Sequence, residues 1–225
     1  LIFTGYRNQQ AAEHLFICTD QQHPAIAGYR GNAVVRTPNL DALAAGGMKF
    51  HNAYSMPQCT PTRAALLTGQ YPWRNGWCNH WDVPRWGAGC HFDWRHNVTF
   101  ARQLREAGYA TAAAGKWQIN DFRIEPLVMS KHGFDDWCMW TGYESGNPPS
   151  GARYQNAYIH TPAGSKTYEG QFGPDVYCDS LLDFYDAVEE AKPFAFRVVD
   201  EIKSYIAESE QLDVKWAEAI DEQIL

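Results

Sequence analysis

The sequence has no excess of positive charge, no long apolar run and no closely paired cysteines. Its formal net charge is −7, which disfavours nucleic acid as a partner, because proteins bind phosphate backbones through basic patches. No apolar run approaches the roughly 20 residues of a transmembrane helix, and no signal peptide is visible. None of the six cysteines belongs to a Cys-x-x-Cys pair, so a zinc site is not expected. The sequence does not decide whether Cys78 and Cys90 form a disulfide.

Composition predicts a folded, globular chain. Hydrophobic residues make up 45% of its 225 residues, enough for a single domain over residues 1–225 with a substantial core. The 9 tryptophans and 12 tyrosines suit a cleft that holds an aromatic ring or a sugar, and they suit the filling of a core equally well.

Apolar runs and capping residues predict alternating strands and helices. Strands are expected at 14–19, 48–54, 109–114 and 193–199, and helices at 40–45, after Cys59, at 100–107 and at 174–190. This alternation favours an α/β fold with a mostly parallel central sheet covered by helices. Residues 71–98 and 142–173 are rich in Gly, Pro, Trp and Asn, which predicts long irregular loops of the kind that often carry function.

The most informative run is Cys-Thr-Pro-Thr-Arg-Ala-Ala-Leu-Leu-Thr-Gly at residues 59–69. Pro61 suits the first turn of a helix, strong helix formers follow, and Gly69 is a plausible end. Cys59 therefore lies at a helix N-terminus, where the positive end of the helix favours an anion. Arg63, one turn later, can return to the same place and bind an oxyanion. A lone cysteine there would more often be structural.

The run resembles the signature of the type I sulfatases, formylglycine-dependent enzymes of the alkaline phosphatase-like superfamily. In that family a maturation enzyme oxidises the cysteine to formylglycine, and the hydrated aldehyde is the nucleophile. The resemblance implies that Cys59 is matured in this way and that Cys59, Arg63 and Lys116 are catalytic.

Two other segments are similar to motifs of the same family. Gly115-Lys116-Trp117 resembles the second signature, in which the lysine contacts the sulfate, so Lys116 and Gln118 are implied as substrate-binding residues. Gln118 stands where the family often has histidine, and an amide cannot carry a proton at neutral pH. Asp20-Gln21 resembles the first metal motif, which implies Ca²⁺ or Mg²⁺ bound by Asp20, Gln21 and Cys59.

The predicted elements place these motifs together. Asp20 and Lys116 each follow a predicted strand, and Cys59 precedes a helix. In an open α/β sheet such positions gather at the carboxyl ends of the strands, where ligands bind. We therefore expect one crevice that contains all three.

The resemblance extends over residues 14–194, and residues 195–225 form an unmatched tail with a helical pattern. The later Asp-His/Asn-Gly metal motif of the family is not recognisable. Residues 1–5 resemble the strand that precedes this motif, but Tyr6-Arg7-Asn8 replace its ligands.

The resemblance implies hydrolysis of a sulfate ester. The alternatives are a phosphonate or phosphodiester hydrolase of the same superfamily, or a catalytically inactive sulfatase-like fragment. The implied partners are a sulfated small molecule or carbohydrate and a formylglycine-generating enzyme. The family resemblance favours a periplasmic or secreted location.

Overall fold

The computed structural model describes residues 2–6, 14–20, 22–78, 92–140, 142, 144 and 147–190. These residues divide into two compact units. The sheet unit contains the described residues of 2–20 and 54–190, and the α1 unit contains residues 22–53. The predicted site residues Asp20, Cys59, Arg63, Lys116 and Gln118 all belong to the sheet unit.

The described residues form a six-stranded sheet in the order β2-β1-β3-β4-β5-β6. β3 and β4 pair in parallel, whereas the other neighbouring strands pair antiparallel. The predicted α/β class is confirmed. The sheet is mixed rather than mostly parallel, because β1 lies antiparallel between β2 and β3 and because β5 and β6 form a hairpin. The strands are β1 (Ile2–Tyr6), β2 (His14–Ile17), β3 (Ala110–Lys116), β4 (Asp136–Trp140), β5 (Tyr158–Thr161) and β6 (Gly164–Thr167).

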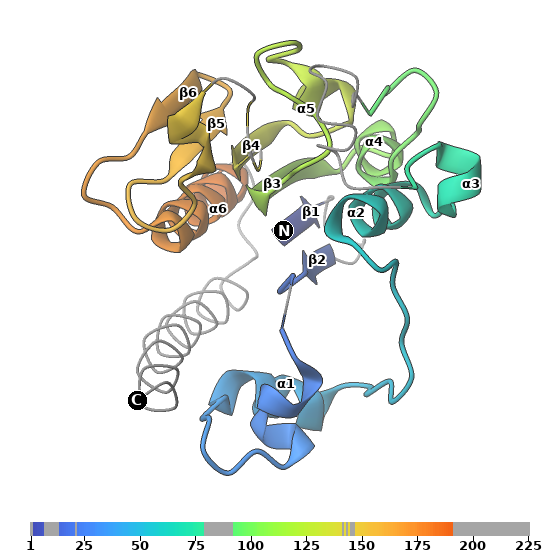
Figure 1. The fold of residues 1–225 in the computed structure, drawn as a ribbon, viewed down its shortest axis with the longest axis vertical. Coiled ribbons are helices and arrows are strands. Elements are labelled where there is room, and N and C mark those ends of the chain that lie inside the picture. The colour runs from blue at the N-terminus through green and yellow to red at the C-terminus, as the bar shows by residue number, and fades with distance from the viewer. Residues whose placement is uncertain are drawn as a thin grey trace. The chain divides into compact units, whose positions relative to one another are not determined.

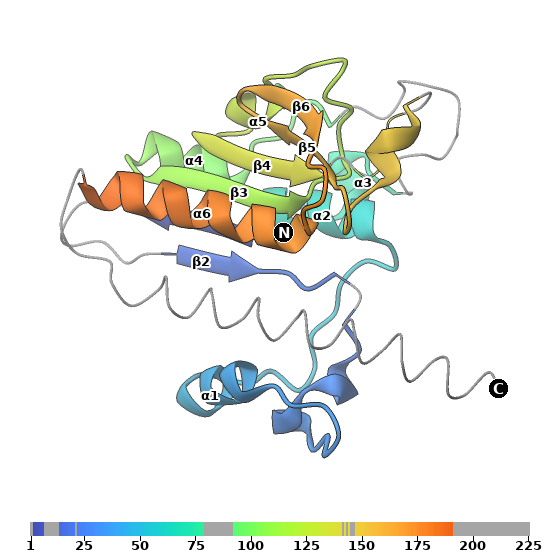
Figure 2. The same cartoon turned by 90° about the vertical axis from the view of Figure 1, so that its left-hand side faces the viewer.

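Helices cover both faces of this sheet (Figure 1). One face packs against α6 (Gly173–Glu190), and the other against α2 (Cys59–Thr68), α4 (Phe100–Glu106) and α5 (Val128–Lys131). Figure 2 shows α6 lying along β3 and β4. Successive residues of β3 face opposite layers: Ala112 and Ala114 join the core beneath α6, while Ala113 joins the core beneath α2 and α4. Their small side chains allow helices to approach from both sides.

Most predicted helices are present, but the observed strands differ from the predicted ones in position and burial. Residues 14–17 form a strand, but it is the outermost strand of the sheet and is partly exposed rather than buried. Residues 48–54 form no strand, because no other described segment pairs with them, and all seven are exposed. Residues 142–173 contribute β5 and β6 instead of an irregular loop alone. The strand predicted at 193–199, the tail at 195–225 and Cys90 lie outside the described residues.

The α1 unit is held mainly by polar contacts. It contains α1 (Pro38–Gly46) and the 3₁₀ turns η1 (Pro24–Ile26) and η2 (Gly28–Arg30). Asp41 Oδ1 accepts hydrogen bonds from the Tyr29 N–H at 2.6 Å and the Thr37 hydroxyl at 3.0 Å. The Thr37 hydroxyl in turn accepts the Gly28 N–H at 2.7 Å. α1 itself has no buried residue, so most of its apolar side chains remain in contact with solvent.

None of the described helices is long and apolar enough to cross a lipid bilayer.

Candidate active site

The strand register places Asp20 and Lys116 at the same edge of the sheet. β2 and β3 run in one direction, since each is antiparallel to β1. Ile2 of β1 is opposite Ile17 on one side and Ala114 on the other. Asp20, three residues after Ile17, and Lys116, two residues after Ala114, therefore leave the sheet at one level. This arrangement agrees with the expectation that Asp20 and Lys116 gather at the carboxyl ends of their strands.

Asp20 forms ion pairs with both predicted cationic site residues. Its Oδ2 lies 2.7 Å from Lys116 Nζ, and its Oδ1 lies 2.9 Å from Arg63 Nη2. The exposed fraction is 3% for the Arg63 side chain, 15% for Lys116 and 32% for Asp20. Arg63 Nη1 also donates to the Lys116 backbone carbonyl. We call these three residues the ion cluster. It carries one net positive charge in a partly desolvated place.

The ion cluster shifts the titration of its carboxylate. Burial acts to raise the pKa of Asp20, but hydrogen bonds from Lys116 and Arg63, together with their charges, outweigh burial. The pKa of Asp20 therefore lies below its ordinary value of 3.8, and the carboxylate stays ionised at neutral pH. Asp20 itself adopts a left-handed backbone conformation with φ 63°, which aspartate tolerates better than most residues.

Cys59 is the first residue of α2, one helical turn before Arg63. Residues four apart lie on the same helix face, with Cβ atoms roughly 5–6 Å apart, so the ion cluster and the Cys59 thiol share one side of α2. Cys59 is a free, partly exposed cysteine. Gln58 provides no side-chain cap for this helix, so the positive N-terminus remains available to an anion.

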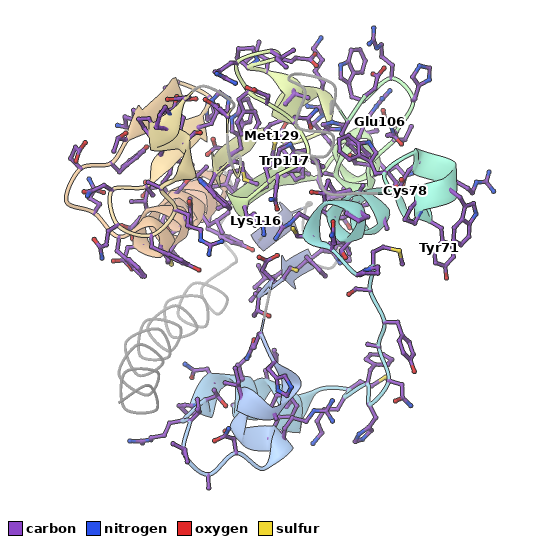
Figure 3. All side chains as sticks on the ribbon, viewed as in Figure 1. Tyr71, Cys78, Glu106, Lys116, Trp117 and Met129 are labelled. Atoms are coloured by element: carbon purple, nitrogen blue, oxygen red, sulfur yellow. The ribbon has the colours of Figure 1, made fainter. Side chains whose placement is uncertain are left out.

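Burial distinguishes Cys138 and Cys178 from Cys59. Cys138 is buried, and burial raises the pKa of its thiol to about 12. Such a thiol is chemically inert at neutral pH. Cys178 is also buried, whereas Cys78 is a free, exposed thiol near α3 (Pro72–Asn75). In Figure 3, Cys78 and Tyr71 lie beside α3, well away from Lys116.

The chain immediately after β3 locks α2 onto the sheet. The Thr60 hydroxyl donates to the Gln118 carbonyl at 3.2 Å, and the Trp117 N–H donates to the Trp140 carbonyl at 2.8 Å. Trp117 is 1% exposed, in the core beneath α2 and α4. Lys116 and Trp117 thus leave the end of β3 in different directions (Figure 3): the lysine turns to Asp20 and the tryptophan anchors the strand.

Gln118, the predicted substrate-binding amide, is almost completely buried. Its backbone is left-handed, with φ 58°, and the residue is 7% exposed. Its side chain packs on Gly142, where an added Cβ would lie 2.8 Å from Gln118 Cγ. The structure therefore places the Gln118 side chain in the interior, and its carbonyl serves as the acceptor for Thr60. The sequence motif fixes the position of residue 118 and not the direction of its side chain, and the contact of Gln118 with substrate stays a prediction.

The donors in the described residues do not fit a divalent cation on their own. Both oxygens of Asp20 already accept from cations, and calcium prefers six to eight oxygen ligands. No group of three or more His, Cys, Asp or Glu residues gathers in the described part of the chain, and Gln21 lies outside it. Tyr6, the last residue of β1, pairs with Ala110, so β1 ends at the opposite side of the sheet from Lys116.

Sequence reasoning missed two contacts of the site. It did not predict that Asp20 is the counter-ion of Arg63 and Lys116, and the metal role of Asp20 stays a prediction. It also gave no role to Thr60, whose hydroxyl joins α2 to the end of β3. The predicted gathering of Asp20 and Lys116 at the carboxyl ends of their strands was the available signal for the first contact. The second depends on tertiary structure and had no local signal.

Comparison with known proteins gives one consistent family. The family described as Sulfatase matches residues 13–201. The chain is 35% identical over 187 residues to N-acetylgalactosamine-6-sulfatase of Canis lupus familiaris, a match that covers 74% of this chain and 35% of that protein. It is 41% identical over 119 residues to human steryl-sulfatase, covering 49% of this chain and 18% of that protein.

A solved structure agrees with the sequence relatives. The crystal structure of Ps i-CgsB superposes with a TM-score of 0.63 at 25% identity, covering 77% of this chain and 41% of that chain. The present chain spans about a third of the length of the canine N-acetylgalactosamine-6-sulfatase. The ion cluster and the Cys59 helix lie within the matched residues, and the chain belongs to the sulfatase family.

Proposed function

We propose that this chain carries the nucleophile and the anion-binding part of a sulfate ester hydrolase. The observation that carries the proposal is the ion cluster of Asp20, Arg63 and Lys116 on the same side of α2 as Cys59. Two cations, a helix N-terminus and a candidate nucleophile share one sheet edge. A sulfate ester is an anion that gains charge on its leaving oxygen as the ester bond breaks, so these groups match it chemically.

Each residue of the ion cluster has a part in this proposal. Arg63 and Lys116 stabilise negative charge on the transferring group, and Arg63 acts from a site that is almost dry, where an electrostatic interaction is stronger than in water. Asp20 holds both cations in place before substrate arrives, so little reorganisation is needed at the moment of reaction. Cys59, when matured to formylglycine, supplies the nucleophilic oxygen. Gln118 shapes the site through its backbone.

The substrate class follows from the family and the cluster charge. Arg63 and Lys116 suit a sulfate group of either a small molecule or a carbohydrate, and the Canis lupus familiaris relative is named for a sugar sulfate. The proposal includes a formylglycine-generating enzyme as the partner that modifies Cys59. Calcium or magnesium at Asp20 and Gln21 belongs to the proposal only with donors beyond the described residues, and no step above relies on it.

Modification of Cys59 is the first test. The chain is produced together with a formylglycine-generating enzyme, and the peptide that contains Cys59 is measured by mass spectrometry. We expect loss of sulfur at Cys59 and an unchanged thiol at Cys78, an exposed cysteine without the motif. An unmodified Cys59 thiol would contradict the proposal. Parallel assays of the matured chain on an aryl sulfate and an aryl phosphodiester then decide between the two hydrolase classes.

A second candidate function is a catalytically inactive sulfatase-like binding module. The engagement of both Asp20 oxygens by cations favours it, because this carboxylate then has no oxygen left for a metal unless an ion pair opens. Calorimetric titration with calcium separates the candidates. Sub-millimolar binding that Asp20→Asn abolishes supports a working metal site, and no binding supports the inactive module.

A further inference from the structure

A histidine and a serine face each other in the hairpin of β5 and β6, which pairs with β4 (Figure 1). His160 of β5 is directly opposite Ser165 of β6. Directly opposite residues of an antiparallel pair project from the same face of the sheet, with Cβ atoms roughly 4.5–5.5 Å apart. The strand register therefore brings the two side chains together, and Ser165 Oγ lies 2.8 Å from His160 Nδ1.

The second ring nitrogen of His160 fixes the tautomer of the imidazole. Nε2 lies 2.8 Å from the backbone carbonyl of Pro126, and a carbonyl can only accept, so Nε2 carries the proton. In the neutral ring Nδ1 then has the lone pair, and the Ser165 hydroxyl donates to it. The serine proton is thus directed at a nitrogen that is able to remove it.

Packing holds this imidazole in one orientation and keeps it neutral. The rings of Phe122 and Trp137 stack with it at centroid distances of 4.1 Å and 6.3 Å, and His160 is only 2% exposed. Burial lowers the pKa of this histidine, although its bond to the Pro126 carbonyl acts in the opposite direction. At neutral pH the ring is therefore a neutral base rather than an imidazolium ion.

The two partners differ in their access to solvent. His160 is buried, whereas Ser165 is exposed on β6, the last strand in the order of the sheet. A reagent can therefore reach the serine hydroxyl while the base behind it is shielded from water. An activated nucleophile needs a reachable hydroxyl, a base within hydrogen-bond distance and a third group that orients the base. Ser165, His160 and the Pro126 carbonyl meet these three requirements.

We propose that Ser165 is the nucleophile of a second catalytic site, which hydrolyses small carboxylic esters. Ser165 Oγ attacks the ester carbonyl carbon and forms a new C–O bond, while its proton passes to His160 Nδ1. The bond to the alcohol oxygen then breaks, and the alcohol leaves with the proton from His160. Water attacks the acyl-serine as the same nitrogen takes a proton from it. The carboxylic acid is released, and His160 returns the proton to Ser165.

The test is labelling of the full chain, produced without a formylglycine-generating enzyme, by a fluorophosphonate. An activated serine forms an O–P bond with this reagent and displaces fluoride, so mass spectrometry of peptides locates the label. We expect labelling at Ser165 to be at least about a hundredfold faster than at Ser55, since a general base contributes roughly 10²–10⁴-fold. Ser55 is the matched control, because it is also exposed but its hydroxyl donates to the Met56 carbonyl.

Two variants separate base catalysis from a structural role. His160→Gln keeps an amide that can form hydrogen bonds but cannot take up a proton at neutral pH, so labelling at Ser165 should fall by about a hundredfold or more. Ser165→Ala should lose the label, together with the rapid release of p-nitrophenol that the parent shows with p-nitrophenyl acetate. Ser55→Ala should behave as the parent does in both assays.

Three results would overturn the proposal. The first is equal labelling of Ser165 and Ser55 in the parent, a comparison that does not require any variant to fold. The others are undiminished labelling of His160→Gln that is folded by circular dichroism, and ester hydrolysis by Ser165→Ala as fast as by the parent. The site uses neither Cys59 nor the ion cluster, so these results are independent of the proposed sulfate ester hydrolysis.

Discussion

Asp20→Asn tests whether the ion cluster exists in solution. The carboxylate joins a 3% exposed arginine to a 15% exposed lysine. An asparagine oxygen can still accept from Arg63, but its amide group would face the Lys116 ammonium, donor to donor. Removing one member of a fully buried ion pair costs about 3–5 kcal/mol, and the 32% exposure of Asp20 reduces this through solvent screening. We expect a loss of about 2 kcal/mol in the free energy of unfolding.

Thermal unfolding followed by circular dichroism measures this loss. For a chain of this length, 1 kcal/mol shifts Tm by roughly 2–4 °C, so Asp20→Asn should unfold about 4–8 °C lower. The control is Glu106→Gln, which breaks the exposed Arg102–Glu106 pair within α4. Exposed pairs of this type contribute about 0.3–0.5 kcal/mol, so Tm should fall by about 1 °C. An equal Tm shift in the two variants would refute the ion cluster.

The Tm difference between the parent and Asp20→Asn, measured as a function of pH, tests the direction of the Asp20 pKa shift. The pKa of Asp20 is lower in the folded state than its ordinary value of 3.8, so the unfolded chain takes up this proton first as the pH falls. The stabilisation by Asp20 is therefore complete well above pH 4 and is lost as the pH falls through the folded-state pKa. The difference in Tm between the parent and Asp20→Asn should be constant near neutral pH and should shrink below about pH 4.

Three further predictions concern the scaffold of the site. Gly133 has φ +98°, and a Cβ added there would lie 2.2 Å from the backbone of α4, so Gly133→Ala should destabilise the fold by more than about 2 kcal/mol. Gly164 has φ +113° but open space around it, so Gly164→Ala should cost only about 1 kcal/mol of backbone strain. Urea unfolding of the two variants measures the difference. Thr60→Val should cost about 1–3 kcal/mol, since the Gln118 carbonyl loses its donor; an unchanged urea midpoint would contradict this contact. Burial lowers the pKa of His160 despite the hydrogen bond of its ring to a backbone carbonyl. The stability that neutral His160 contributes is therefore present above about pH 6.5, and it falls at lower pH as the unfolded chain takes up a proton. His160→Gln should flatten the dependence of stability on pH between about pH 5 and 7.

The sequence predicted the parts of the site that depend on local structure. Pro61 and Gly69 define the ends of a helix, and α2 begins at Cys59 as the motif indicated. Lys116 follows a run of small and apolar residues, and it ends β3. The alternation of strands and helices was enough to place Asp20 and Lys116 at one edge, because carboxyl ends of strands with the same direction meet there.

The remaining features depend on contacts between distant segments. Asp20 pairs with residues 43 and 96 positions away, which no local pattern reveals. Residues 1–5 resembled a strand of the family, but the antiparallel pairing of β1 with β2 and β3 was not predicted, and the hairpin of β5 and β6 forms in a segment that was predicted as a loop. The side-chain direction of Gln118 follows from its left-handed backbone and from Gly142, so a motif could not predict it.

The most direct measurement of the central claim is the effect of Lys116→Ala on turnover of an aryl sulfate by the matured chain. Loss of one charge-stabilising donor should lower kcat/KM by about a hundredfold. The control Lys131→Ala removes a lysine that is 43% exposed and 3.9 Å from Glu125, and it should leave kcat/KM unchanged. If the matured parent does not hydrolyse the ester, or if Lys116→Ala hydrolyses it as fast as the parent, the assignment of the ion cluster to sulfate ester chemistry is wrong.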